Sequence, residues 1–152
     1  MVSLETGKDA RIKSIIRNIL EAYNKKDLTS MLSFYADDAI YVRSEGTFRG
    51  KEEIKRYYNW NYSVNSEASL TEKCIIVEGD MAVIEWAFEG TSVRGGKKAQ
   101  LQFLSIFEFK NEKVQEVHIY QDRLLTAKQL ANGWFEKTII NAVLNRMEKG
   151  LR

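Results

Sequence analysis

The chain has 152 residues, enough for one domain that buries about 68–70% of the surface its unfolded chain exposes. Its 23 basic and 21 acidic side chains nearly cancel and are scattered along the chain, which argues against nucleic acid or an anionic membrane as the main partner. No apolar run approaches the roughly 20 residues that cross a bilayer. We therefore expect a single soluble domain spanning residues 1–152.

Cysteine, histidine and glycine do not form the common cofactor motifs. Cys74 is the only cysteine and His118 the only histidine, so the sequence offers no internal disulfide and no zinc-ligand spacing. Gly95 and Gly96 lie among lysines in a predicted hairpin, not between a strand and a helix. We expect no metal and no cofactor. The opening segment lacks the apolar core of a signal peptide, and together with the single cysteine this predicts a cytoplasmic protein.

Two helices are predicted at the start of the chain. The first opens at Lys8 or Asp9, and its apolar residues recur at the spacing of one buried stripe. Polar residues 24–26 end it, and Asp27 is placed to cap a second, shorter helix. The first stripe contains Ile12, Ile15, Ile16, Ile19, Leu20 and Tyr23, and the second helix carries Leu28, Met31, Leu32, Phe34 and Tyr35.

A short strand, a turn and a third helix follow. Residues 39–43 alternate in the manner of a strand, Glu45-Gly46 marks a turn, and Gly50 precedes the helix. Acidic residues in the first turn of this helix suit the positive end of the helix dipole. Its predicted inner side carries Ile54, Tyr57, Tyr58 and Asn61.

From Glu67 onward the hydrophobic period changes to two. Strands are predicted to end at Glu78 and to run over residues 81–90, 98–110 and 114–122, with short polar turns between them. Four such strands form an antiparallel meander, and helices followed by strands predict an α+β fold. The strand over 98–110 is apolar on both faces, so we expect both of its faces to be covered.

The chain returns to helix after the last strand. An apolar stripe continues almost to the C-terminus and is broken at Asn132-Gly133, so residues 132–152 form a C-terminal helical extension. The stripe requires a partner, and three are compatible with it. In the first, the extension folds over a cavity mouth with Trp134 and Phe135 as a plug. In the second it packs on the outer face of the sheet, and in the third it packs on a second subunit.

Several segments in order resemble the NTF2-like superfamily, most closely its SnoaL-like and ketosteroid-isomerase-like branch. AYNKKDLTSMLSFYADDAIYV resembles the family's opening, with its Asn-x-x-Asp-Leu corner and Ala-Asp-Asp-Ala exit. FRGKEEIKRYY resembles its third helix, and EKVQEVHIYQDRLLTAKQL resembles its closing strand. The resemblance implies a cone of N-terminal helices packed on a strongly curved antiparallel sheet, around a cavity that holds a small hydrophobic molecule. This scaffold hosts isomerases, cyclases, hydrolases and proteins without chemistry, so the fold alone does not decide the reaction.

The catalytic set of ketosteroid isomerases is not retained. The family's general-base aspartate falls on Arg43, which cannot take up a proton, and its two oxyanion donors fall on Ile19 and Ser105. Only a supporting tyrosine is kept, as Tyr58. The closing-strand aspartate of limonene epoxide hydrolases falls on Ile119. The resemblance therefore favours a binding protein over an enzyme of either type.

The register of the closing strand decides which side chains face the cavity. In the family register Ile119 and Gln121 point inward and complete an aromatic pocket with Arg43 as its one fixed cation, unless Arg43 instead pairs with Glu45 or Glu52 at the surface. Such a pocket suits a planar ligand with a carboxylate, phenolate or carbonyl opposite the guanidinium. The candidate ligand-binding residues are Tyr41, Arg43, Tyr58, Trp60, Trp86, Phe88, Phe103, Ser105, Ile119 and Gln121.

A one-residue slip would exchange the two faces of the strand. The cavity would then hold Glu85, His118, Tyr120 and Asp122, an acid–base group and our candidate catalytic residues. In the family register His118, Tyr120 and Asp122 point outward, where NTF2-like sheets pair into dimers. A single histidine on a strand is more often structural than catalytic.

These patterns predict a homodimer that binds a small apolar or aromatic molecule. The first alternative is a cofactor-free isomerase, polyketide cyclase or hydrolase that uses acid–base groups in the cavity. The second is a protein-interaction module that uses the open face of the sheet, marked by an exposed apolar patch. The orientation of His118 and Asp122 separates binding from catalysis, because only inward side chains within hydrogen-bond reach of each other support an enzyme.

Overall fold

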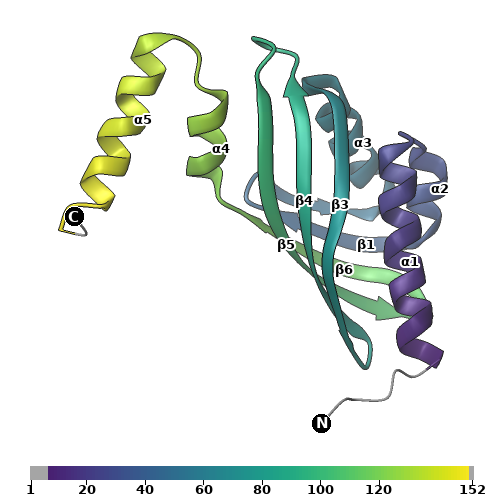
Figure 1. Cartoon of the computed structure of the whole chain (residues 1–152). Helices are drawn as coiled ribbons and strands as arrows, with labels where there is room; N and C mark the ends of the chain where they lie inside the picture. Colours follow the sequence, from purple (N-terminus) through teal and green to yellow (C-terminus); the bar gives the residue numbers. More distant parts are fainter. Residues whose placement is uncertain (1–6, 151–152) are drawn as a thin grey trace.

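The structure, a computed structural model, describes residues 7–150 and forms one curved sheet with helices on both sides (Figure 1). In chain order the elements are α1 (Gly7–Asn24), α2 (Leu28–Ser33), β1 (Tyr35–Arg43), β2 (Gly46–Arg49), α3 (Gly50–Val64), β3 (Asn65–Glu78), β4 (Met81–Ser92), β5 (Lys98–Lys110), β6 (Lys113–Gln121), α4 (Arg123–Leu130) and α5 (Gly133–Met147). The predicted α+β class is confirmed.

The six strands are ordered β2-β1-β6-β5-β4-β3. The predicted antiparallel meander from β3 to β6 is present, with Trp86 opposite Phe103 and Ser105 opposite Ile119. The pairing of β1 with β6 is parallel, so the sheet is mixed rather than wholly antiparallel. This pairing joins residues 76 to 79 positions apart in the sequence, such as Tyr41 and Val117, which periodicity within either segment does not reveal.

Two elements near the start differ from the sequence prediction. β1 begins at Tyr35, where a helical end was predicted, because the strand pairs there with Val114 of β6. The four-residue strand β2 was not predicted, since it is too short to display a period of two; it is held on β1 with Phe48 opposite Tyr41. Asp27 caps α2 as predicted, accepting a hydrogen bond of 3.0 Å from the backbone N–H of Ser30.

One face of the sheet and the inner stripes of α1 and α3 form the core. The predicted stripe of α1 is almost entirely buried, and α1 packs on β3 while α3 packs on β1. On β4 and β5 every second residue is buried, and these alternate with half-buried or exposed neighbours. The strands therefore present an inner face toward the helices and an outer face away from them.

The outer face of β5 is not covered within the chain. β5 lies between β6 and β4, as expected for a central strand, but Leu104 on its outer face is 43% exposed and Ile106 is only half-buried. The prediction that both faces are covered is therefore wrong for a single copy of the chain.

The C-terminal segment forms a helical hairpin at the side of the sheet (Figure 1). Asp122 caps α4 by accepting a hydrogen bond of 2.9 Å from the N–H of Leu125, and Gln129 makes two bonds of 2.8 Å to the backbone of Gln100 on β5. α5 continues outward and packs against α4. Trp134 and Phe135 are 77% and 64% exposed, so of the three positions considered for the extension, the plug of a cavity mouth is wrong. Within residues 7–150 no helix is long and apolar enough to span a membrane.

Candidate functional site

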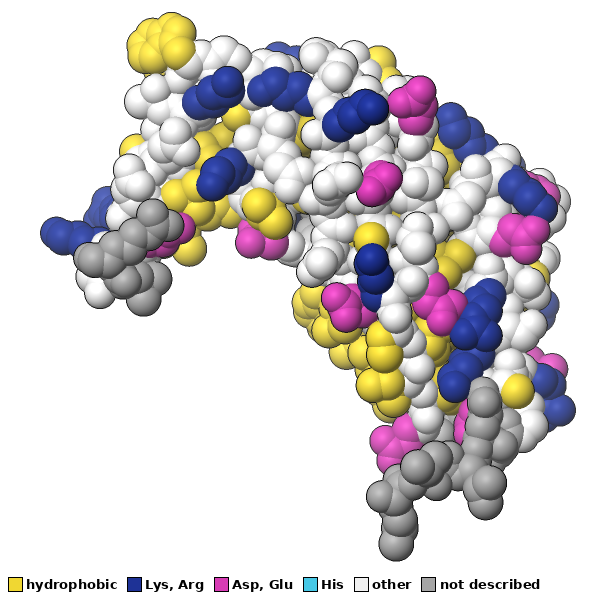
Figure 2. Space-filling view, viewed as in Figure 1, with side chains coloured by type: hydrophobic (Ala, Val, Ile, Leu, Met, Phe, Trp, Pro, Cys, Tyr) yellow, Lys and Arg dark blue, Asp and Glu magenta, His cyan; other side chains and the backbone are white. Residues whose placement is uncertain are grey.

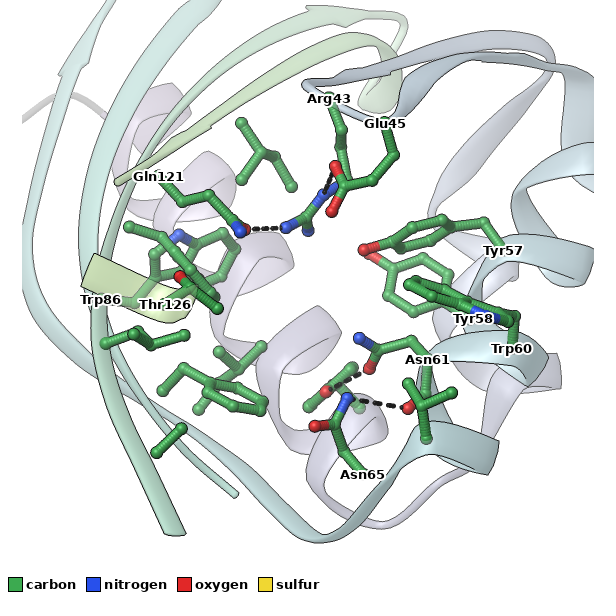
Figure 3. A pocket seen from close by; sticks show the side chains of 18 of the residues that line it. Arg43, Glu45, Tyr57, Tyr58, Trp60, Asn61, Asn65, Trp86, Gln121 and Thr126 are labelled. Carbon is green, nitrogen blue, oxygen red and sulfur yellow. Dashed lines mark hydrogen bonds and ion pairs between the residues drawn. The ribbon is translucent and has the colours of Figure 1, made fainter. Parts of the chain in front are cut away.

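A cavity of about 280 Å³ lies between the inner face of the sheet and helix α3. Its volume is near the lower end of the range of about 300–1,000 Å³ usual for small-molecule sites. Aromatic rings form most of its wall, and Thr126 and Leu130 of α4 close one side (Figure 3). The lining residues include Tyr23, Tyr35, Tyr41, Arg43, Glu45, Tyr57, Tyr58, Trp60, Asn61, Asn65, Leu70, Trp86, Phe88, Leu101, Phe103, Phe107, Ile119 and Gln121.

Arg43 is the cation of this cavity. It is the last residue of β1, and its side chain is only 10% exposed. Its Nη1 donates to the hydroxyl of Tyr41 at 3.3 Å, its Nη2 donates to Oε1 of Gln121, and its Nε lies 3.4 Å from Oε2 of Glu45. The guanidinium also lies 5.2 Å from the ring centre of Tyr57, within the range of a cation–π contact.

Glu45 partly balances the charge of Arg43 at the cavity edge. Its side chain is 24% exposed, and its carboxylate also accepts a hydrogen bond of 3.0 Å from the hydroxyl of Ser44. Burial raises the pKa of Glu45, but the guanidinium of Arg43 and the hydrogen bonds to the carboxylate outweigh it and lower the pKa below its usual value. Glu45 is therefore ionised at neutral pH and is a weak base.

Four tyrosines gather beside Arg43. The rings of Tyr41, Tyr57 and Tyr58 pack edge-on or tilted with centres 5.3–5.5 Å apart, and Tyr35 lines the same cavity. Burial raises the pKa of Tyr35, Tyr57 and Tyr58 well above the usual value. These hydroxyls stay protonated at physiological pH, so they donate hydrogen bonds but do not act as bases.

A second polar group lies across the cavity from Arg43 (Figure 3). The hydroxyl of Tyr23 donates to Oδ1 of Asn61 at 2.8 Å, and the side-chain amide of Asn65 donates to the backbone oxygen of Asn61 at 3.0 Å. These bonds hold the Asn61 amide with its oxygen engaged by Tyr23 and its nitrogen toward the cavity. The cavity thus has a cationic end and an amide end, separated by aromatic rings.

The structure brings nine of the ten predicted ligand-binding residues to the cavity wall. The exception is Ser105, which is fully buried and accepts a hydrogen bond of 2.9 Å from Nε1 of Trp86. Ser105 therefore holds the indole of Trp86 in place from behind the wall. Ile19, at the position of an isomerase oxyanion donor, is a buried core residue of α1.

The four candidate catalytic residues lie outside the cavity. On the outer face, His118 bonds Glu116 at 2.6 Å, Tyr120 is 54% exposed, and Glu85 is exposed. Asp122 serves as the cap of α4. The slipped register does not occur, because Val117 and Ile119 of β6 are buried on the inner face. His118 and Asp122 therefore form no inward-facing pair.

Sequence reasoning missed part of the cavity wall. Glu45 was assigned to a turn and considered as a surface partner of Arg43 that would exclude Arg43 from the cavity. The pair forms, but at the cavity wall, because the short β1–β2 connection brings Glu45 beside Arg43 there. Tyr57 and Asn61 were placed on the inner side of the third helix, and that helical spacing was the signal that could have assigned them to the cavity. Tyr23 ends the stripe of α1 and carried no separate signal.

No cluster of three or more metal-ligating side chains is present in the part of the chain that the structure describes. Cys74 is free and exposed on β3. The charged groups of the cavity wall are Arg43 and Glu45, so its chemistry rests on one cation, one weakly basic carboxylate and neutral hydroxyl and amide groups.

Solved structures with the same architecture identify the fold. An NTF2-like protein of unknown function from Burkholderia pseudomallei K96243 superposes with a TM-score of 0.75 at 20% identity, covering 80% of this chain and 98% of that one. A putative SnoaL-like polyketide cyclase from Jannaschia sp. CCS1 has a TM-score of 0.80 at 10% identity, covering 87% and 99%. TerC, co-crystallised with polyporic acid, has a TM-score of 0.73 at 22% identity, covering 78% and 97%. These likenesses show an NTF2-like fold.

The sequence itself matches the SnoaL-like domain over residues 16–117, which is more than half of the chain. The chain therefore belongs to the SnoaL-like domain family, as its motifs predicted. A search of the curated proteins found no match. The matched segment ends within β6, so α4 and α5 lie beyond it.

Proposed function

We propose that the chain binds a small planar aromatic molecule that carries an acidic oxygen, with this oxygen on Arg43. The observation that carries the proposal is a guanidinium that is only 10% exposed at the wall of an aromatic cavity. A cation removed from water is costly unless an opposite charge accompanies it. Glu45 supplies part of that charge beside Nε, and a carboxylate, phenolate or enolate of the ligand would add to it at the terminal nitrogens.

The hydrogen bonds of Arg43 leave room for such a ligand. A guanidinium has five N–H groups, one on Nε and two on each terminal nitrogen. Glu45 accepts from the N–H on Nε, Tyr41 from one N–H on Nη1, and Gln121 from one N–H on Nη2. One N–H on each terminal nitrogen remains, which suits the two oxygens of a carboxylate. Gln121 and Tyr41 hold the guanidinium in position, so little side-chain freedom is lost when a ligand binds.

The amide end of the cavity adds a second requirement. The oxygen of Asn61 already accepts from Tyr23, while no hydrogen bond from its amide nitrogen to the described residues is present. A ligand with a carbonyl or hydroxyl oxygen at the end remote from its acidic group would accept from this nitrogen. The proposed ligand is therefore an aromatic molecule with oxygen functions at both ends. TerC, which shares the fold, was co-crystallised with polyporic acid, and this supports including organic acids among the ligands to be tested.

An enzyme is the second candidate, and Arg43 favours one form of it. Glu45 is a weak base and the buried tyrosines are weak acids, so the cavity offers no strong proton-transfer group. A fixed cation in a largely dry site can nevertheless stabilise an enolate that forms during ring closure. The putative polyketide cyclase from Jannaschia sp. CCS1 has the same fold, which supports testing aromatic precursors for cyclisation as well as for binding.

A pair of nearly isosteric ligands tests the proposal. Tryptophan fluorescence would be titrated with 2-naphthoate and with 2-naphthamide, which has the same ring system without the charge. Trp86 and Trp60 line the cavity, and a Trp134→Phe background removes the exposed tryptophan of α5. We expect saturable binding of 2-naphthoate and weaker binding of the amide.

The Arg43→Ala variant should weaken 2-naphthoate binding by roughly 1.5–3 kcal/mol, about 10- to 150-fold, the usual contribution of a charged hydrogen bond. It should leave 2-naphthamide binding nearly unchanged. Arg94→Ala removes an exposed arginine whose side chain is not part of the cavity wall and serves as the matched control. Equal losses for acid and amide in Arg43→Ala, or no saturable binding of any ligand, would refute the proposal.

A further inference from the structure

Helix α5 presents an apolar stripe that has no partner among the described residues. None of its fifteen residues is buried, and Phe135, Ile139, Val143 and Met147 recur every four residues and are all exposed. The neighbouring side of the helix faces α4 and includes Ile140, with Ile139 at the boundary between this side and the stripe. Phe135, Val143 and Met147 lie away from α4. A helix of this length is marginal in water when it packs on so little, and most helical stability in proteins comes from a buried apolar face. The stripe therefore needs a surface to cover it.

The outer face of the sheet is a second apolar surface without a partner in the chain. Strand pairing places Leu104 beside Tyr120, and both are exposed. In the next row across the sheet, Val83 lies opposite Ile106, Ile106 lies opposite His118, and His118 lies opposite Val42. This row therefore adds Val83, Ile106 and Val42. We call these five apolar residues the outer patch. Figure 2 shows hydrophobic side chains along the notch that separates the C-terminal helices from the rest of the molecule.

Two copies could cover these surfaces by stacking their outer faces or by laying the helices of one copy on the outer face of the other. The charges of the surfaces favour the second arrangement. The outer faces of β4, β5 and β6 carry four glutamates against three lysines, the lysines lying at the strand ends: Glu85, Glu89, Glu108, Glu116, Lys98, Lys110 and Lys113. Helices α4 and α5 carry four basic residues against one acidic residue: Arg123, Lys128, Lys137, Arg146 and Glu136. Stacking two outer faces directly would oppose like charges, whereas laying the helices on the sheet opposes unlike charges.

We propose that two copies of the chain exchange their C-terminal helices, with the stripe of α5 in each copy lying on the outer patch of the other. A two-fold axis makes the exchange reciprocal, so both stripes and both outer patches are covered at once. The second copy is chosen as partner because the two surfaces have opposite net charge and belong to the same molecule. The inference is independent of the proposed ligand and extends beyond it.

The mass in solution gives the first test. Light scattering after size exclusion should give twice the 17.6 kDa of one chain for the full-length protein. Val143→Glu and Leu104→Glu should each reduce the mass to that of one chain while far-ultraviolet circular dichroism keeps its β-sheet signal. Asn141→Glu, on the opposite side of α5, should remain dimeric and serves as the control. A monomeric full-length protein, or dimerisation unaffected by Val143→Glu, would overturn the proposal.

Cross-linking gives the second test and distinguishes exchange from other packings. In a Cys74→Ser background, chains carrying Val143→Cys are mixed with differently tagged chains carrying Leu104→Cys and oxidised. Helix exchange predicts a disulfide-linked pair that contains one chain of each kind. Linkage only between two Leu104→Cys chains would indicate direct sheet stacking, and linkage only between two Val143→Cys chains would indicate helix pairing. A chain carrying both changes that links internally, at the mass of one chain, would place α5 on its own sheet; each of these three results would overturn the exchange.

Discussion

The two faces of the sheet differ in the side chains that they carry and in whether the rest of the chain covers them. The inner face of β4 and β5 carries Trp86, Phe88, Phe103 and Phe107, which α1 and α3 enclose around the cavity. The outer face of the same strands carries glutamates among apolar residues and has no cover in the chain. Because successive side chains alternate between faces, one strand can supply a ligand cavity and a surface for another chain at the same time.

The polar side chains of the two faces also differ in their hydrogen-bond partners and in their surroundings. Inside, Arg43, Tyr41, Gln121 and Asn61 are held by hydrogen bonds from different elements and converge on a cavity. Outside, His118 bonds Glu116 on its own strand and nothing encloses the pair. This pair therefore lies on the opposite side of the sheet from the cavity that would hold a ligand.

The largest expected contrast concerns stability. Phe107→Ala, at a fully buried position of the inner face, should lower the free energy of unfolding by about 3–5 kcal/mol because it leaves a cavity in the core. Gln102→Ala, on the exposed outer face of the same strand, should change it by less than about 0.5 kcal/mol. Urea unfolding followed by circular dichroism measures both, and similar effects for the two variants would contradict the assignment of faces.

The buried tyrosines predict a loss of stability in alkali. The pKa values of Tyr35, Tyr57 and Tyr58 are raised by burial above the value of 10.0 expected when unfolded. The contribution of these tyrosines to the free energy of unfolding is complete below pH 10. It is lost as the pH rises from 10 toward the pKa of the tyrosines in the folded protein, because in this range the tyrosines ionise readily only in the unfolded chain. Each such tyrosine should lower the free energy of unfolding by up to about 1.4 kcal/mol at pH 11.

Absorbance at 295 nm during a pH titration checks this prediction. The buried tyrosines should ionise only together with unfolding, seen as a simultaneous loss of circular dichroism. A Tyr58→Phe variant should show a shallower decline of stability with pH. Ionisation of all tyrosines near pH 10 in a protein that remains folded would contradict the burial of this group.

A smaller effect is expected at the amide end of the cavity. Asn61→Leu removes the free amide donor and should weaken binding of 6-hydroxy-2-naphthoate by about 0.5–1.5 kcal/mol, roughly 2- to 13-fold. It should leave 2-naphthoate binding unchanged, because that ligand has no oxygen at the far end. Isothermal titration calorimetry of both ligands measures the difference. Equal losses for both would show that Asn61 acts only through packing, without a hydrogen bond to the ligand.

The smallest expected effect concerns His118. Because its ring lies on the outer face, His118→Ala should leave the affinity for 2-naphthoate unchanged within error. Loss of the partly exposed pair with Glu116 should cost no more than about 1 kcal/mol in stability. A large loss of ligand affinity would require His118 to reach the cavity and would contradict the register of β6.

Much of the cavity was predictable because it lies on elements with strong periodicity. The alternation in β4 and β5 and the helical spacing in α3 indicated which side chains share a face, and five of the nine predicted residues that reach the wall lie on these elements. Tyr41, Arg43, Ile119 and Gln121 lie on β1 and β6, and the register of the family resemblance indicated that β6 turns Ile119 and Gln121 inward. Ser105 shows the limit of the method. A residue can share the parity of the wall and still lie behind it, because a larger neighbour such as Trp86 covers it.

The sequence by itself determined the α+β class, the family, and the order of the helices and the meander, but it left open which face of β6 is the inner one. Local periodicity and capping suffice for these features because they act over a few residues. Only the tertiary structure decided the parallel pairing of β1 with β6, the meeting of Glu45 with Arg43, and the open position of α5. These depend on contacts between distant segments, whose geometry follows from how the whole sheet curves and which surfaces remain to be covered.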